Sequence, residues 1–207
     1  MQCWLPHHFK PREYQMPFNV AMDRGYRRAI SCWHRRSGKD KTHINFGIKE
    51  SAKRIGTYYY CFPTQALGPK IIWNGMDRDG FRFMDHFPPG SIVRSSDRDM
   101  MVELAWGSVF QIIGTDNLDV VGTNPVGCIM SEYSLQNPKA WEYIQPILRE
   151  NNGWAIFNFT PRGYNHAKEL IDKVQDSPNW FVEILTILDT GAVDPEEIEQ
   201  DIRMGVI

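Results

Sequence analysis

The segment from Trp33 to Thr42 has the residue types of a phosphate-binding loop. Gly38 and Lys39 follow an apolar run and precede a helix-like stretch. A strand that leads into a helix leaves unpaired N–H groups at the helix N-terminus, where a polyphosphate can accept hydrogen bonds. Gly38 permits close backbone approach, and Lys39 supplies a positive charge for the β- and γ-phosphates. This segment therefore predicts a nucleotide site.

The loop departs from the pattern G-x-x-x-x-G-K-[ST] at two positions. Trp33 stands where the first glycine is expected, and Asp40 replaces the Ser or Thr that ligates magnesium. Because Gly-Lys after a strand is common, a basic turn with a glycine spacer is the alternative interpretation of this loop taken alone.

A second candidate site follows the apolar run 126–130. Ser131 and Glu132 come next, where a hydrolysing P-loop enzyme normally has Asp-Glu. In such a pair the aspartate lies near the metal and the glutamate polarises the attacking water. Glu132 is therefore our candidate catalytic carboxylate, with a water-positioning role in phosphoryl transfer. The alternative is an ordinary acidic residue at the end of a strand.

The two departures compensate for each other. The loop carries a carboxylate at Asp40 and the strand carries a hydroxyl at Ser131, which is the reverse of the usual arrangement. A magnesium shell needs oxygen ligands and negative charge, and either element can supply them. We hypothesise that Asp40 and Ser131 have exchanged roles as ligands of one Mg²⁺.

The arginines near these motifs have several candidate roles. One of Arg35 and Arg36 could stabilise the γ-phosphate in cis while the other pairs with an acid. We favour Arg35 as the catalytic arginine and assign Arg36 to ATP binding. Arg94 and Arg98 could act in trans on a neighbouring subunit, or could be surface residues. The remaining loop residues assigned to ATP binding are Ser37, Gly38, Lys39, Asp40 and Lys41.

Charge along the chain is uneven although the net charge is only −2. From Arg24 to Arg54 there are ten Lys or Arg residues against two acids, whereas 189–207 contains six acids and one arginine. A basic block in a near-neutral chain favours a local anion site over a whole surface built for nucleic acid. A solvated basic helix face is the alternative.

The elements that must position these residues alternate between strand and helix, which is typical of an α/β fold. We expect a helix over 40–53, another that Asn137 caps, and a last one that opens at Asp194. The expected strands are 28–33, 55–62, 126–130, 154–159 and 181–188, with a hairpin over 101–113. The predicted fold is a mainly parallel, twisted sheet with helices on both faces and nucleotide at the carboxyl ends of the strands.

Length and composition describe an ordinary globular protein. The 207 residues are 42% hydrophobic and 23% charged, which excludes disorder, collagen and coiled coil. The longest apolar run, 180–188, is too short to span a membrane, so we expect no membrane partner. Four scattered cysteines without C-x-x-C, and six histidines without ligand spacing, argue against a zinc site.

Taken together, these motifs resemble those of the ATPase domain of the large terminase subunit of tailed bacteriophages, the motor that packages DNA. His34–Asp40 is similar to the family's Arg-Arg-x-Gly-Lys loop. The other matching segments are Pro11–Gln15, Pro63–Gln65, Gly114–Asn117 with Gly122, and Phe159–His166.

The resemblance implies roles for three further residues. Tyr14 and Gln15 would contact adenine, although a packed N-terminal arm is the alternative. Thr160 would sense the γ-phosphate and couple hydrolysis to DNA movement; otherwise it is a turn residue before Pro161.

The resemblance also implies a fold and an activity. The fold would be a P-loop NTPase of the additional-strand, catalytic-glutamate type. Residues 1–179 would form the ATPase core, and 180–207 the last strand and the start of a small lid. The activity would be Mg²⁺-dependent ATP hydrolysis that drives double-stranded DNA into a procapsid, with ATP and Mg²⁺ as cofactors.

Partners and location follow from the same resemblance. The partners are double-stranded DNA, the portal protein, the small terminase subunit and further copies in a homo-oligomeric ring. The location is the cytoplasm of the infected bacterial host. The family's full-length subunit also carries a nuclease domain. This sequence ends before such a domain could fit, so we expect no DNA cleavage by it.

Two other functions stay open at this point. A helicase-type translocase shares these motifs but would need a second motor domain. A nucleotide-binding assembly module with little hydrolysis would explain the altered loop and strand motifs. Because Lys39 and Glu132 are both present, we favour the enzyme.

Overall fold

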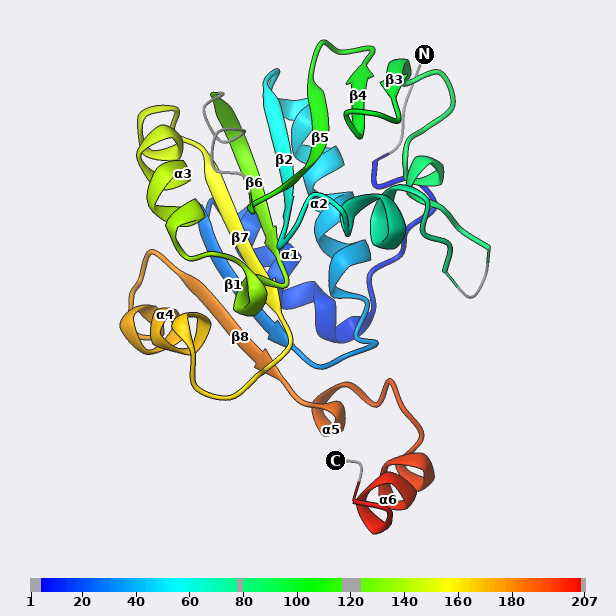
Figure 1. Ribbon diagram of the computed structural model, residues 1–207, viewed down its shortest axis with the longest axis vertical. Helices are drawn as coiled ribbons and strands as arrows, with labels where there is room; N and C mark the ends of the chain where they lie inside the picture. Colours follow the sequence, from blue (N-terminus) through cyan, green and yellow to red (C-terminus); the bar gives the residue numbers. More distant parts are fainter. Residues whose placement is uncertain (1–4, 78–79, 117–123, 206–207) are drawn as a thin grey trace.

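The computed structural model describes residues 5–77, 80–116 and 124–205. Within them lies an eight-stranded sheet in the order β3-β4-β5-β2-β6-β7-β1-β8 (Figure 1). Strand β4 is antiparallel to both of its neighbours, and the other described pairs are parallel. The strands are β1 Arg28–Trp33, β2 Thr57–Phe62, β3 Ile92–Ser96, β4 Met101–Leu104, β5 Val109–Gly114, β6 Pro125–Ser131, β7 Trp154–Phe159 and β8 Phe181–Leu185. The predicted mainly parallel sheet is confirmed.

Helices cover both faces of the sheet (Figure 1). These are α1 Met16–Asp23, α2 Lys39–Lys53, α3 Lys139–Glu150 and α4 His166–Val174, whereas α5 Ile187–Thr190 and α6 Pro195–Arg203 lie outside these layers. Shorter helical turns are η1 Glu13–Gln15, η2 Pro69–Trp73, η3 Phe83–His86 and η5 Tyr133–Leu135.

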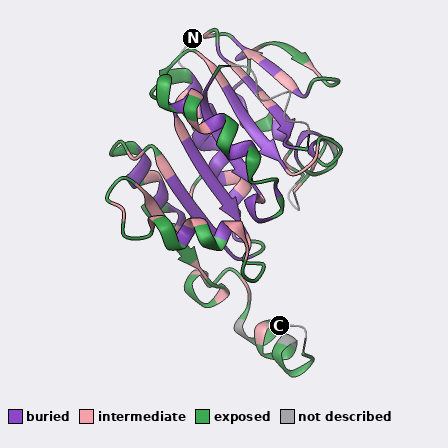
Figure 2. Ribbon diagram, turned by 60° about the vertical axis from the view of Figure 1, so that its left-hand side comes forward, coloured by how far each residue is buried: buried purple, intermediate pink, exposed green. Residues whose placement is uncertain are grey.

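Each face of the sheet has its own hydrophobic core. Tyr58 and Tyr60 of β2 pack with residues of α1 and α2, whereas Tyr59 and Cys61 pack with residues of α3 and α4. This alternation is the period of two that a strand imposes on its side chains. Because both faces are covered, the central strands are buried along almost their whole length (Figure 2).

Two predicted boundaries were wrong for local reasons. The strand expected over 181–188 ends at Leu185, because Thr186 caps a new helix by donating its Oγ1 and N–H to Asp189 Oδ2 at 2.6 and 2.7 Å. Helix α3 has Pro138 as its N-cap instead of Asn137, whose Oδ1 still accepts a hydrogen bond from the Lys139 N–H at 3.1 Å. Asp194 caps α6 as predicted.

The last strand belongs to the main sheet. β8 pairs with β1 over its whole length, while α5 and α6 lie beyond the carboxyl end of β8 (Figure 1). Whether 180–207 begins a lid stays a prediction. None of the described helices is long and apolar enough to cross a membrane.

Strand order brings the candidate site together. β7 lies between β1 and β6, with Asn158 level with both Ser31 of β1 and Ser131 of β6. The carboxyl ends of these three parallel strands therefore meet at one edge of the sheet, where open α/β sheets bind their ligands. An additional strand between the loop strand and the glutamate strand is the arrangement that the resemblance implies.

Candidate nucleotide-binding site

The loop between β1 and α2 has the backbone of a phosphate-binding turn. Gly38 has φ +76° and Arg36 has φ +68°, both in the left-handed region that favours glycine. A Cβ on Gly38 would lie 3.1 Å from Gln15 Nε2, so close packing also favours glycine here. Immediately after Gly38 the first turn of α2 begins, and its N–H groups have no earlier turn to bond.

Trp33, the residue at the first-glycine position, has a packing role. Its side chain is fully buried and contacts the rings of Phe18 and His43. The loop therefore leaves the sheet from an aromatic anchor in the core, which accounts for this departure from the pattern.

Tyr14 and Gln15 hold the loop from the N-terminal side. The Tyr14 hydroxyl and the Gln15 Nε2 both donate to the carbonyl oxygen of Ser37, at 2.8 Å each. Gln15 is 2% exposed, and its Oε1 accepts a hydrogen bond from the Arg12 N–H at 2.9 Å. In this structure both side chains support the loop, and their contact with adenine stays a prediction.

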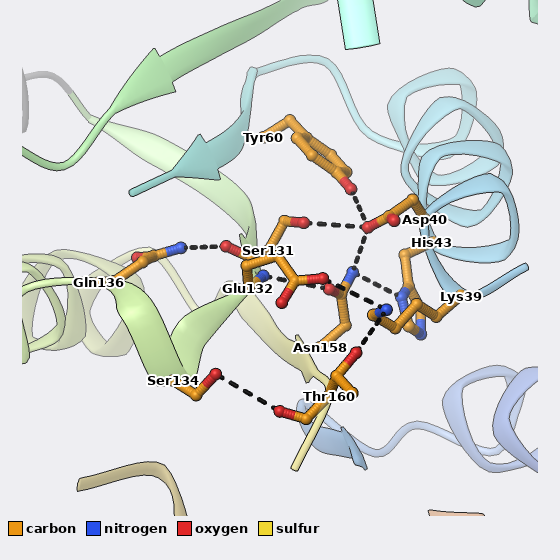
Figure 3. Close-up of polar contacts among 10 residues, drawn as sticks. All are labelled: Lys39, Asp40, His43, Tyr60, Ser131, Glu132, Ser134, Gln136, Asn158 and Thr160. Carbon is orange, nitrogen blue, oxygen red and sulfur yellow. Dashed lines mark hydrogen bonds and ion pairs between the residues drawn. The ribbon is translucent and has the colours of Figure 1, made fainter. Parts of the chain in front are cut away.

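Lys39, Glu132 and Thr160 converge from three segments (Figure 3). Lys39 Nζ lies 3.3 Å from Glu132 Oε1 and donates to Thr160 Oγ1 at 3.1 Å. The Lys39 side chain is only 7% exposed, so its charge is largely shielded from bulk water. The structure therefore places the predicted phosphate lysine, catalytic carboxylate and sensor hydroxyl in one cluster.

Asp40 and Ser131 also meet (Figure 3). Ser131 Oγ donates to Asp40 Oδ1 at 2.9 Å. The same oxygen accepts hydrogen bonds from the Tyr60 hydroxyl at 2.6 Å and from Asn158 Nδ2 at 3.3 Å. No described residue donates a hydrogen bond to Oδ2. Burial, reinforced by the nearby Asp40 charge, raises the pKa of Tyr60 well above its ordinary value, which keeps this hydroxyl a donor.

Asn158 connects the two halves of the site. Its Oδ1 accepts a hydrogen bond from the Glu132 N–H at 3.4 Å, and its Nδ2 lies 2.9 Å from His43 Nδ1. His43 Nε2 in turn lies 3.1 Å from Ser31 Oγ. Burial lowers the pKa of His43 to about 3, against a smaller opposing effect of Asp40, so the ring is neutral near pH 7. Sequence analysis missed Asn158, Tyr60 and His43.

The backbone at Glu132 is unusual for a non-glycine residue. It has φ +51°, immediately after β6 ends. The preceding carbonyl, that of Ser131, is held by Gln136 Nε2 at 2.7 Å. Glu132 Oε2 is buried and accepts no hydrogen bond from a described residue. A strained backbone with an unpaired buried oxygen is typical of functional sites.

The donor set fits magnesium. Asp40, Ser131 and Glu132 offer oxygen atoms, which Mg²⁺ prefers as ligands. Among the described residues there is no group of three His, Cys, Asp or Glu that could hold a metal ion without further ligands. Mg²⁺ is commonly bound by one or two carboxylates together with substrate phosphates and water, so an incomplete protein shell suits this ion.

A cleft opens beside the loop. It has a volume of about 510 Å³, and Arg36, Gly38, Lys39 and Asp40 line it. Lys41 also lines the cleft, but its Nζ donates to Asp77 Oδ2 at 2.8 Å. A smaller adjoining cavity of about 160 Å³ has Gln15, Gly38 and Lys41 in its wall.

The structure places the candidate arginines in different surroundings. Arg35 and Arg36 are both exposed, neither forms an ion pair with a described residue, and Arg36 lines the cleft whereas Arg35 does not. Arg94 forms an ion pair with Glu103 across β3 and β4, and Arg98 is exposed in the turn between these strands. The cis role of Arg35 and the trans roles of Arg94 and Arg98 stay predictions.

The other motif segments lie beside the site. The Gln65 N–H donates to Asp116 Oδ1 at 2.9 Å, which joins the segment after β2 to the segment after β5. Asn117 and Gly122 fall outside the described residues. His166, at the start of α4, lies with Nε2 2.7 Å from the carbonyl oxygen of Tyr133, so α4 contacts the turn that follows Glu132.

Sequence comparison finds no relative: no protein-family model and no curated protein matches the chain. Structure comparison finds the ATPase domain of the large terminase of Thermus phage P74-26, with TM-score 0.75 and 18% identity over 97% of this chain and 92% of that one. The chain has the fold of a large terminase ATPase domain.

A second large terminase, from another thermophilic bacteriophage, has the same fold, with TM-score 0.74 and 15% identity. The match covers 95% of this chain and 50% of that one, so the chain spans about half the length of this second terminase. Crystals of the second terminase in complex with ADP and with ATP-gamma-S match with TM-scores of 0.72 and 0.71. Likeness at this level of identity establishes the terminase ATPase fold.

Proposed function

We propose that the chain is a Mg²⁺-dependent ATPase that drives translocation of double-stranded DNA into a viral procapsid, as the ATPase part of a large terminase subunit. The observation that carries the proposal is the contact of Lys39 with Glu132 and Thr160 beneath a left-handed Gly38 turn. Nucleotide binding by the second terminase, which has the same fold, supports it.

Each residue of the cluster has a distinct role in this proposal. The N–H groups at the start of α2 and the ammonium of Lys39 bind the β- and γ-phosphates. Glu132, released from Lys39 by the incoming phosphates, orients the attacking water. Thr160 senses the γ-phosphate. The contacts of α4 with the turn after Glu132 transmit the resulting conformational change away from the site.

The cofactors are ATP and Mg²⁺. Asp40 and Ser131 would hold the metal ion, which when bound would neutralise charge on the phosphate oxygens. Tyr60 and Asn158 position Asp40 by donating to its Oδ1, so that Oδ2 is left for the ligand. Tyr14, Gln15 and Arg36 complete the ATP site, and Arg35 stabilises the transferred phosphoryl group.

The proposed partners are those that the resemblance to large terminases implies. They are double-stranded DNA, the portal protein, the small terminase subunit and further copies of the chain in a ring, in the cytoplasm of an infected bacterium. Residues 1–179 form the ATPase core in this proposal, and 180–207 contribute the last strand and the start of a lid.

ATP turnover with and without duplex DNA tests the function. We expect hydrolysis that requires Mg²⁺ and is stimulated by duplex DNA. Tight ATP binding without turnover, even at high protein concentration on DNA, would favour the assembly module. The altered loop and strand motifs are the observation that supports this alternative. Displacement of one strand of a duplex would favour the helicase-type translocase.

A further inference from the structure

The basic block of the sequence is divided between two ends of the molecule. Arg24, Arg27 and Arg28 lie at the amino end of β1, whereas the nucleotide loop begins at its carboxyl end. The strand has six residues, which at about 3.3 Å per residue separates the two groups by about 20 Å. The arginines at the amino end are therefore too far away to serve the nucleotide.

These arginines line a cavity of their own. It has a volume of about 830 Å³ and lies between the connection from α1 to β1, the end of α3 and the segment before β8. Arg24, Arg27, Arg28 and Arg149 contribute four positive charges, and no described Asp or Glu lines it. Asn152 and Trp180 complete part of the wall.

Within the described chain none of the four arginines forms an ion pair. Among the described residues, ion pairs are formed by Lys39, Lys41, Lys49, Lys53, Arg94, Lys168 and Arg203. A cavity that gathers four uncompensated guanidinium groups favours an anionic ligand.

Arg28 is fixed in the floor of this cavity. Its Nη1 donates to the carbonyl oxygens of Gly153 at 2.9 Å and Arg27 at 2.8 Å, and its guanidinium lies 5.5 Å from the centre of the Trp141 ring. Burial lowers the pKa of Arg28, and the positive charges of Arg149 and Arg27 add to this effect. Arg24, Arg27 and Arg149 are exposed around it.

We propose that this cavity, which we call the arginine cavity, binds phosphate groups of a DNA duplex. Arginine forks suit phosphate oxygens, and four of them on two segments exceed what one small anion can engage. A nucleic-acid backbone carries regularly spaced phosphates and can contact all four. Arg54 extends the basic surface next to the cavity, with Nη2 donating to Asn151 O at 2.7 Å. The choice of duplex DNA rests on the proposed function.

The position of the arginine cavity suits a DNA duplex. Because the arginine cavity lies at the amino end of β1 and the nucleotide cleft lies beside the loop that follows its carboxyl end, duplex and ATP do not compete for space. Strand β1 runs from the arginine cavity to the loop that lines the nucleotide cleft.

The test is the salt dependence of duplex binding, measured by fluorescence anisotropy. The variant Arg24→Gln/Arg149→Gln removes two exposed charges and spares the packed Arg28. Losing two phosphate contacts should reduce the slope of log K against log salt by about 1.8. The charge-matched control Lys139→Gln/Arg203→Gln, at two exposed residues outside the cavity, should keep the wild-type slope. ATP binding should be the same in all three proteins.

The outcomes separate this inference from the proposed function. If the arginine-cavity variant and the control bind duplex with the same slope as wild type, the inference is wrong while the proposed function stands. If inorganic tripolyphosphate binds in an arginine-dependent way and duplex does not, the cavity is a site for a free anion and the inference is likewise overturned. Normal duplex binding without any ATP turnover would instead count against the proposed function alone.

Discussion

Lys39 and Glu132 form an ion pair, with Nζ 3.3 Å from Oε1, although they belong to different elements far apart in the sequence. The same ammonium contacts the Thr160 hydroxyl at 3.1 Å. The Glu132 carboxylate therefore lies beside the Lys39 ammonium where a phosphate oxygen would bind. In the proposed function this is a resting site, in which the candidate catalytic carboxylate is held beside the candidate phosphate-binding lysine.

Replacing Glu132 by glutamine should separate binding from hydrolysis. Glu132→Gln keeps the shape of the side chain but removes its negative charge, so Lys39 is freed for phosphate and ATP should bind at least as tightly as in wild type. The rate constant kcat should fall by about 10²–10⁴-fold because water is no longer activated. Isothermal titration calorimetry and a phosphate-release assay measure the two effects.

Glu142→Gln is the matched control for this change, because Glu142 is exposed on α3. It should leave both quantities unchanged. An unaltered kcat in Glu132→Gln would remove this residue from the mechanism.

The proposed exchange of metal roles predicts rescue. Asp40→Ser leaves two hydroxyls and should weaken Mn²⁺ binding in the presence of ATP, and both single variants should lower ATPase activity, because Ser131→Asp leaves two carboxylates in place of one carboxylate and one hydroxyl. The double variant restores one carboxylate and one hydroxyl and should recover part of both. Electron paramagnetic resonance of Mn²⁺ gives an affinity that does not depend on turnover. Equal loss in all three variants would contradict the exchange.

The two loop arginines should differ in their kinetic signatures. Arg36 lines the cleft, so Arg36→Ala should mainly raise the Kd for ATP. If Arg35 stabilises transition-state charge, Arg35→Ala should lower kcat at least about tenfold with little change in ATP affinity. Steady-state kinetics combined with a direct binding measurement distinguishes the two. A normal kcat in Arg35→Ala would show that this arginine is a surface residue.

The buried His43 should make folding stability sensitive to acid. Its pKa in the folded protein is about 3, against an ordinary value of 6.5, so the unfolded chain binds a proton that the native ring does not. The stabilising contribution is complete above pH 6.5 and is lost as the pH falls toward 3. The free energy of unfolding should decrease by up to about 1.4 kcal/mol per pH unit from this group.

Urea unfolding at pH 7.5 and pH 5.5 measures this effect. His43→Gln should show a shallower pH dependence than wild type, whereas His8→Gln, at an exposed position, should match wild type. The same pH dependence in all three proteins would mean that His43 is not held in its neutral form.

Local sequence patterns were sufficient to predict the strand, the Gly38-Lys39 turn and the helix that follows it. A β-branched strand, a glycine with lysine and a helical stripe are adjacent in the chain, so their mutual geometry follows from short-range rules. The contact between Asp40 and Ser131 could also be expected from the sequence, because the two residues depart from the usual motifs in complementary ways.

The supporting residues could not be predicted in this way. Tyr60 and Asn158 lie in apolar strands, where local patterns suggest only packing. Their contacts with Asp40 exist because β7 lies between β1 and β6 and because α2 crosses this face. Strand order is a long-range property that no single segment specifies.

The basic block illustrates the same limit. In the sequence, residues 24–54 form one run of positive charge, which we interpreted as a single anion site. Because β1 passes through the middle of this run, the fold sends Arg24, Arg27 and Arg28 to the opposite end of the sheet from Lys39. A run of charge in the sequence therefore does not specify which of its residues lie together in the fold.

The most direct test of the account is ATP binding to the variant Lys39→Ala, measured by calorimetry beside the control Lys49→Ala. Lys49 lies on the same helix but pairs with Asp23, with Nζ 2.8 Å from Oδ1. We predict that Lys39→Ala loses at least about tenfold in affinity, or 1.4 kcal/mol, while Lys49→Ala binds like wild type. Wild-type affinity in Lys39→Ala would contradict the claim that the Gly38-Lys39 turn holds the triphosphate.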